Sequence, residues 1–112
     1  MGIVAPFPSN AATQIVFDRA ELTRILDLYG RMVAAGHWKD YALEMGREAA
    51  IFSAFRRAAE RPEVRIEKRP ALRNRQGQWV LYGEQGVVLK RGNELGPVLA
   101  PVERRLMKLV EG

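Results

Sequence analysis

The residues in this sequence best suited to chemistry are basic side chains that crowd between positions 56 and 75. They are Arg56, Arg57, Arg61, Arg65, Lys68, Arg69, Arg73 and Arg75. The acids in this window are fewer (Glu60, Glu63 and Glu67), so the net charge of +5 arises here and the rest of the chain is balanced. A guanidinium is a planar fork that holds phosphate or carboxylate oxygens through paired hydrogen bonds. The window therefore predicts a site that binds anions, above all nucleic-acid phosphates.

Aromatic residues close to this window suggest that the site also stacks bases. They are Phe52, Phe55, Trp79 and Tyr82. Aromatic and arginine side chains on one sheet face form a stacking platform for single-stranded nucleic acid. An alternating strand over 64–69 places Arg65, Glu67 and Arg69 on one face and Lys68 on the other. The candidate binding residues are Arg56, Arg57, Arg65, Arg69, Arg73, Arg75, Trp79, Lys90 and Arg91.

Two interpretations of these arginines stay open at the level of sequence. Convergence of Arg65, Arg69, Arg73, Arg75 and Arg91 on one open face without carboxylates would favour nucleic-acid binding. Pairing of each with a glutamate would instead indicate a solvated sheet face. The alternative function is a protein-interaction or adaptor module, which presents the same basic face or a sheet edge to an acidic protein.

Other chemically capable residues do not form a catalytic set. His37 is the single histidine, and it follows an expected helix end, where a cation favours the helix carbonyls. Ser9 and Ser53 lack a Gly-x-Ser-x-Gly motif. Asp40 and Glu44 share a strand face and could bind a hard cation, but pairing with arginines on the next strand is the simpler expectation. We therefore expect a non-enzymatic protein with no metal and no cofactor.

The segment 83–86 has a glycine at each end, in a spacing that some nucleic-acid-binding loops share. The Gly-x-x-Gly spacing matches the loop that clamps nucleic-acid backbone between two helices in KH domains. Here strands are expected on both sides, so a hairpin turn is the better interpretation.

One long helix is expected over 19–35. Asp18 and Glu21 have the spacing of a capping box, and Gly36 suits the end of the helix. Its apolar positions repeat every three to four residues: Leu22, Ile25, Leu26, Tyr29, Met32 and Val33.

The remaining patterns predict mostly strands. They cover 13–17, 40–45, 64–69, 78–82 and 87–90, with a basic loop over 71–77. Residues 49–57 fit either a strand, paired with 40–45 across a turn, or an alanine-rich helix, and we favour the strand. A short helix is expected near 93–99, and residues 102–110 are either a second helix or a closing strand, since prolines interrupt the helical spacing.

The predicted fold class is α+β: a curved antiparallel sheet of about four to six strands with one long N-terminal helix packed on it and a short C-terminal helix. A chain of 112 residues fits a single domain, expected over 13–112 behind a flexible leader over 1–12. The apolar stretch from Leu95 to Val110 either completes the core or forms a dimer seam. Monomer and homodimer both remain open, and we prefer the core.

Composition indicates a soluble cytoplasmic protein. The chain is 47% apolar and 28% charged, as in ordinary globular proteins. Its lack of cysteine excludes disulfides and favours a reducing compartment. No apolar run approaches the length of a transmembrane helix, and the first residues lack the features of a signal peptide.

Several strings in the sequence carry a family resemblance: Phe52-Ser53-Ala54-Phe55-Arg56-Arg57, Arg65-Ile66-Glu67-Lys68-Arg69-Pro70, Gln76-Gly77, Leu89-Lys90-Arg91-Gly92 and Glu94-Leu95. Through them, the stretch from Phe17 to Val110 resembles a small alphaproteobacterial family defined as a domain of unknown function. The resemblance implies a stand-alone bacterial cytoplasmic protein. It implies no activity and no site residues.

Overall fold

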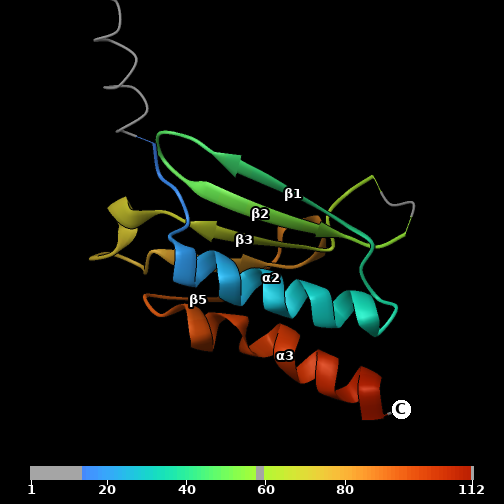
Figure 1. Cartoon of the computed structure of the whole chain (residues 1–112). Helices are drawn as coiled ribbons and strands as arrows, with labels where there is room; N and C mark the ends of the chain where they lie inside the picture. The colour runs from blue at the N-terminus through green and yellow to red at the C-terminus, as the bar shows by residue number, and fades with distance from the viewer. Residues whose placement is uncertain (1–13, 58–59, 112) are drawn as a thin grey trace, which may run out of the picture.

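A five-stranded antiparallel sheet with two helices packed on one face forms the body of this protein (Figure 1). This computed structural model describes residues 14–57 and 60–111, so the leader expected over 1–12 lies outside it. The helices are α2 (Arg19–Ala34) and α3 (Leu95–Glu111); the strands are β1 (Asp40–Met45), β2 (Ala50–Phe55), β3 (Val64–Lys68), β4 (Trp79–Tyr82) and β5 (Val88–Gly92). The predicted α+β class is confirmed.

Helix α2 begins where the capping box predicted. Glu21 N donates to the Asp18 carboxylate, and Asp18 N donates to the Glu21 carboxylate, each at 2.8 Å. These bonds satisfy two of the amides that every helix leaves unpaired at its N-terminus. The buried stripe consists of Ile25, Leu28 and Met32. Leu28 was not part of the predicted stripe, whereas the predicted Val33 is exposed.

The strands lie side by side in the order in which they occur along the chain, β1-β2-β3-β4-β5. The ambiguous segment 49–57 forms β2, which pairs with β1 in the predicted hairpin from Met45↔Ala50 to Asp40↔Phe55. The strand predicted over 13–17 is wrong for residues 14–17, which are not in a strand, and residue 13 lies outside the described residues. A single backbone bond, from Ile15 N to Gly46 O at 2.7 Å, joins this segment to the β1–β2 turn. Phe17 is instead buried against Trp79, just before the capping box begins α2.

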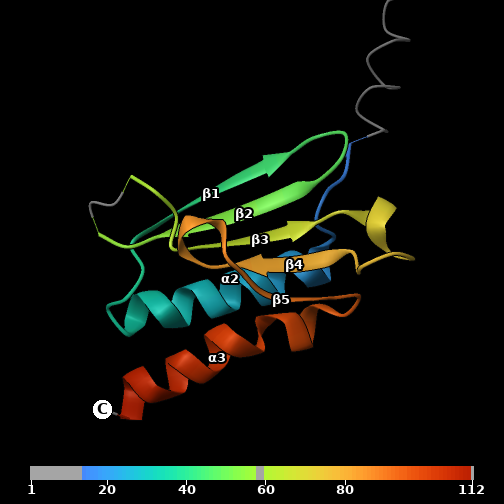
Figure 2. The ribbon, with the colours of Figure 1, turned by 180° about the vertical axis from the view of Figure 1, so that it is seen from behind.

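The short helix predicted near 93–99 is the first part of α3, which continues to Glu111. Residues 102–110 are therefore helical. Pro101 lacks the amide that would bond to the carbonyl one turn earlier. The helix nevertheless continues, because Val98, Leu99, Val102 and Leu106 are all buried in the core. Figure 2 shows α3 running beneath β5, its principal neighbour in the sheet. This burial favours the core over the dimer seam for these four residues.

The two faces of the sheet differ in what covers them. Residues that alternate toward the helices, such as Phe52, Ile66 and Leu81, belong to the apolar core. The intervening residues point away from both helices, and we call this side of the sheet the bare face. Its central row crosses the strands in register as Ile51, Glu67, Val80 and Arg91. No helix in the described part of the chain is long and apolar enough to cross a membrane.

Candidate nucleic-acid interface

Strand β3 and the residue that follows it place Arg65 and Arg69 around one buried carboxylate on the bare face. Glu67 is only 2% exposed. Arg65 Nη2 donates to its Oε2 at 2.8 Å, and Arg69 Nε donates to its Oε1 at 3.0 Å. Arg69 Nη1 also lies 3.8 Å from the exposed Glu48 carboxylate, so two carboxylates accompany the two guanidiniums. Lys68 points to the opposite face, as alternation predicted, and its Nζ bonds to Glu21 of α2 at 2.7 Å.

Strands β4 and β5 add an aromatic ring and a third arginine to this surface. The Arg65 guanidinium carbon lies 4.8 Å from the centre of the Tyr82 ring, within the range of a cation–π contact. Arg91 of β5 pairs in register with Val80, whose side chain is on the bare face. We call the surface formed by Arg65, Arg69, Tyr82 and Arg91 the basic half of the bare face.

The loop between β3 and β4 carries Arg73 and Arg75 to one end of this surface. Asn93 fixes the loop beside the end of β5, because its Nδ2 donates to Arg73 O at 3.0 Å and its Oδ1 accepts from Gln78 N at 2.8 Å. Arg73 and Arg75 are exposed. Across residues 14–57 and 60–111, no ion pair involves Arg73, Arg75 or Arg91. The predicted convergence is thus partial, since two arginines are paired and three are not.

Other predicted site residues lie elsewhere. Trp79 is 2% exposed and stacks on Phe17 at a centroid distance of 6.0 Å, so it cannot stack on a base. Lys90 pairs in register with Leu81 and therefore points toward the helix side. Arg56 and Arg57 follow β2 at the opposite end of the sheet from Arg73. Sequence proximity suggested one surface for all of them, but strand alternation separates neighbours onto opposite faces.

The β1 side of the bare face is acidic. Asp40 and Glu44 share this face, as their spacing predicted, and pair in register with Phe55 and Ile51. No group of three or more metal-ligating side chains occurs among the described residues. The bare face therefore runs from an acidic edge at β1 to a basic half over β3–β5.

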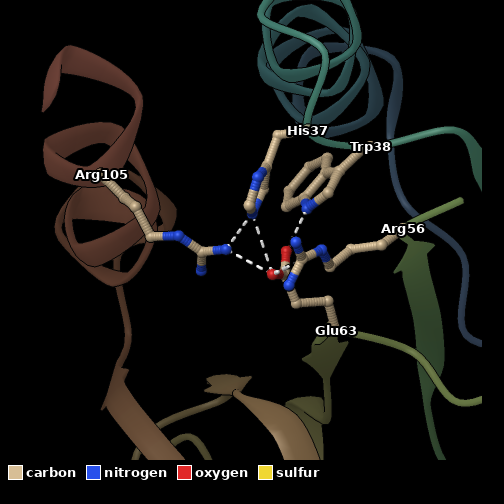
Figure 3. Close-up of polar contacts among 5 residues, drawn as sticks. All are labelled: His37, Trp38, Arg56, Glu63 and Arg105. Atoms are coloured by element: carbon tan, nitrogen blue, oxygen red, sulfur yellow. Dashed lines mark hydrogen bonds and ion pairs between the residues drawn. The ribbon is translucent and has the colours of Figure 1, made fainter. Parts of the chain in front are cut away.

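A second polar cluster, missed by the sequence analysis, is centred on Glu63 at the start of β3 (Figure 3). Its carboxylate accepts from Trp38 Nε1 at 2.5 Å and lies 2.9 Å from His37 Nε2. Arg105 of α3 contacts both Glu63 and His37. Arg56 Nε lies 4.0 Å from the same carboxylate.

The Glu63 carboxylate is held in its charged form despite its burial. Burial by itself raises the pKa of Glu63, but hydrogen bonds from Trp38 and Arg105, together with the charges of Arg105 and His37, outweigh it and leave the pKa below its usual value. The cluster joins α3, the loop after α2 and the start of β3. His37 was expected at the helix carbonyls. Its true partners lie 26 and 68 positions away, so local spacing carries no signal of them.

A family model described as a protein of unknown function, DUF2794, matches residues 15–99 of the chain. This match covers the whole sheet, α2 and the first turn of α3. No curated protein and no solved structure matches the chain.

Proposed function

We propose that this chain, which belongs to the DUF2794 family of proteins of unknown function, is a non-enzymatic module that binds nucleic acid through the basic half of its bare face. One observation carries the proposal. Both helices pack on one face of the sheet, and Arg65, Arg69 and Arg91 lie on the face that the helices leave open. A sheet surface with arginines and an aromatic ring suits a strand of nucleotides.

The ion pairs with Glu67 leave the arginines able to bind phosphate. A guanidinium has five N–H donors, and Arg65 gives Glu67 only those of Nη2. Glu67 also orients both arginines, which lowers the entropy that each loses when it binds a phosphate. Arg91, Arg73 and Arg75 then extend the positive surface toward the end of the sheet. Binding would rest on phosphate neutralisation, so it would weaken steeply with salt.

The same contacts support a role without catalysis. Ser53 is buried in the sheet, with Arg65 opposite it in register rather than a base. His37 contacts Glu63 and Arg105, so its ring is engaged in the ion cluster. We further propose a bacterial cytoplasmic location, which the absence of cysteine supports.

A protein-interaction module is the second candidate. An acidic partner would contact the basic half, whereas the exposed edge strand β1 would accept a strand of a partner. Five of the six β1 residues are exposed, including Tyr41 and Leu43. Its outer side faces no other strand of the sheet, so an incoming strand could add there by backbone pairing.

The test measures fluorescence anisotropy of labelled single- and double-stranded DNA and RNA at several salt concentrations. The variant pair Arg69→Gln and Arg91→Gln removes two charges from the basic half. Its matched control, Arg19→Gln with Arg104→Gln, removes two exposed charges from the helices. We expect the first pair to weaken binding and to reduce the slope of log K against log salt by roughly 1.4–1.8, with little change in the control.

Equal losses in both pairs would show that only net charge matters and would contradict a defined surface. Absence of binding at low salt, where phosphate contacts are strongest, would overturn the nucleic-acid proposal. Binding of a protein partner that is lost on substitution of β1 residues would then favour the second candidate.

A further inference from the structure

A cavity of about 310 Å³ opens at the end of the sheet where β4 turns toward β5. Its lining residues are Arg61, Pro62, Arg65, Tyr82, Gly83, Gln85 and Gly86. Arg65 and Tyr82 also belong to the basic half of the bare face, so the cavity adjoins that surface. It lies at the opposite end of β3 from Arg69.

The charged groups of this cavity are both cationic. Arg61 and Arg65 line it, and no carboxylate does. Arg61 is exposed and forms no ion pair within the described ranges 14–57 and 60–111. Arg65 is paired with Glu67, so the uncompensated positive charge at the cavity is that of Arg61. The cavity therefore favours an anion.

Arg65 has hydrogen-bonding capacity that the described protein groups do not use. Its Nη2 bonds to Glu67, whereas its Nε is buried and has no acceptor among the described residues. A buried donor without an acceptor is unfavourable, because it has lost its bond to water. A small shift of the guanidinium toward an oxyanion would satisfy it.

The walls of the cavity limit the shape of its ligand. Pro62 bounds one side, and the 84–86 turn bounds another. That turn reverses the chain through positive φ angles of 62° at Gln85 and 77° at Gly86. With the proline and the turn in its walls, the cavity suits a compact group, such as a small molecule or the end of a longer one.

We propose that this cavity binds a phosphate monoester. Its terminal oxygens would accept from Arg61 and Arg65, since a guanidinium pairs well with a phosphate. The volume exceeds that of a bare ion and matches the lower end of small-molecule sites, about 300 Å³. A compact organic group attached to the phosphate would lie against Tyr82. The ligand is either a free phosphorylated small molecule or the 5′-phosphate of a nucleic-acid strand, and the proposal does not depend on binding along the basic half.

Isothermal titration calorimetry with four probes tests the cavity and distinguishes the two sources. The probes are adenosine 5′-monophosphate, adenosine, and a trinucleotide with either a 5′-phosphate or a 5′-hydroxyl. We expect the monophosphate to bind and adenosine not to bind. Tighter binding of the 5′-phosphorylated trinucleotide than of the monophosphate identifies a strand end as the ligand, and equal or weaker binding identifies a free small molecule.

Variants of exposed arginines supply the control. Arg61→Gln should weaken phosphate-dependent binding by about tenfold or more, because it removes a charge-assisted bond. Arg104→Gln, an exposed arginine of α3 that does not line the cavity, should leave it unchanged. Equal affinity for phosphorylated and unphosphorylated probes, or equal losses in the two variants, would overturn the proposal. The variant with Arg69 and Arg91 replaced tests the basic half separately. Loss of oligonucleotide binding in that variant alone would support the basic half and not the cavity.

Discussion

At the scale of single residues, Glu63 is one of two buried glutamates in the described structure, the other being Glu67. Glu63 is 5% exposed, and its carboxylate is surrounded by groups from the loop after α2, from α3 and, through Arg56, from the end of β2. A buried charge is tolerated only when hydrogen bonds and opposite charges replace its hydration. Glu63 meets this condition through Trp38 and Arg105, so its replacement should be costly.

Glu63→Gln should lower the free energy of unfolding by about 1–3 kcal/mol. The neutral amide can still accept from Trp38, but it loses the attraction of Arg105, whose side chain is partly exposed. Urea unfolding of the variant and the natural protein measures the difference. Glu60→Gln, at an exposed position, is the control, and an equal loss there would contradict a specific role for the cluster.

The lowered pKa of Glu63 also predicts how stability depends on pH. Because the pKa is lower in the folded protein than in the unfolded chain, ionised Glu63 stabilises the fold fully above the unfolded value of about 4.3. That contribution is lost as pH falls through the folded pKa. Urea unfolding between pH 6 and pH 3 should show the gap between the natural protein and Glu63→Gln closing in acid. A gap that stays constant would contradict the shift.

At the scale of elements, the loop from β3 to β4 depends on one close backbone approach. Gly77 has a φ of +99°, and a Cβ built on it would lie 2.8 Å from backbone atoms of Gly92. Its position beside β5 keeps the loop, with Arg73 and Arg75, at the end of the basic half. A side chain at Gly77 should therefore disturb both the sheet and the proposed surface.

Gly77→Ala should be more destabilising than Gly36→Ala by about 1–3 kcal/mol. Both glycines have positive φ, but nothing lies within 4 Å of a Cβ on Gly36. Both variants carry the cost of a positive φ, so the difference between their stabilities reports the collision with Gly92. Thermal unfolding of the two variants measures it, and equal stabilities would mean that the loop moves aside freely.

At the scale of the whole molecule, α3 completes the core although the family match ends at residue 99. Val102 and Leu106 lie beyond that boundary, and both are buried. Arg105 lies there as well and reaches Glu63 across the helix–sheet interface. The C-terminal part of α3 is therefore integral to this chain's fold.

Deleting residues 100–112 should abolish cooperative unfolding. Burial of Val102 and of Leu106 each contributes about 1.5–3 kcal/mol, and the deletion also leaves Glu63 without Arg105. Near-ultraviolet circular dichroism and a thermal melt should show lost tertiary packing. Deleting only residues 109–112 removes the exposed Leu109 and Val110 and should have a small effect. Similar melts for both deletions would contradict the role of Val102 and Leu106.

Local patterns in the sequence determined most of the secondary structure. The capping box at Asp18 places the start of α2, and alternation in residues 64–69 places Arg65 and Arg69 together. Such signals depend on neighbours along the chain, so they can be interpreted without the fold. They gave a wrong prediction of a strand at residues 14–17, because β propensity does not depend on whether a partner strand is present.

Only the tertiary structure decided which charges act together. Arg65 and Arg69 share the buried Glu67, Trp79 and Lys90 turn away from the bare face, and Glu63 gathers partners from α3 and the loop after α2. It also decided that α3 continues through Pro101, because four buried side chains outweigh one missing backbone bond. The physical reason is the same in each case. Burial and charge pairing depend on distances in space between residues far apart along the chain, and no local pattern records those distances.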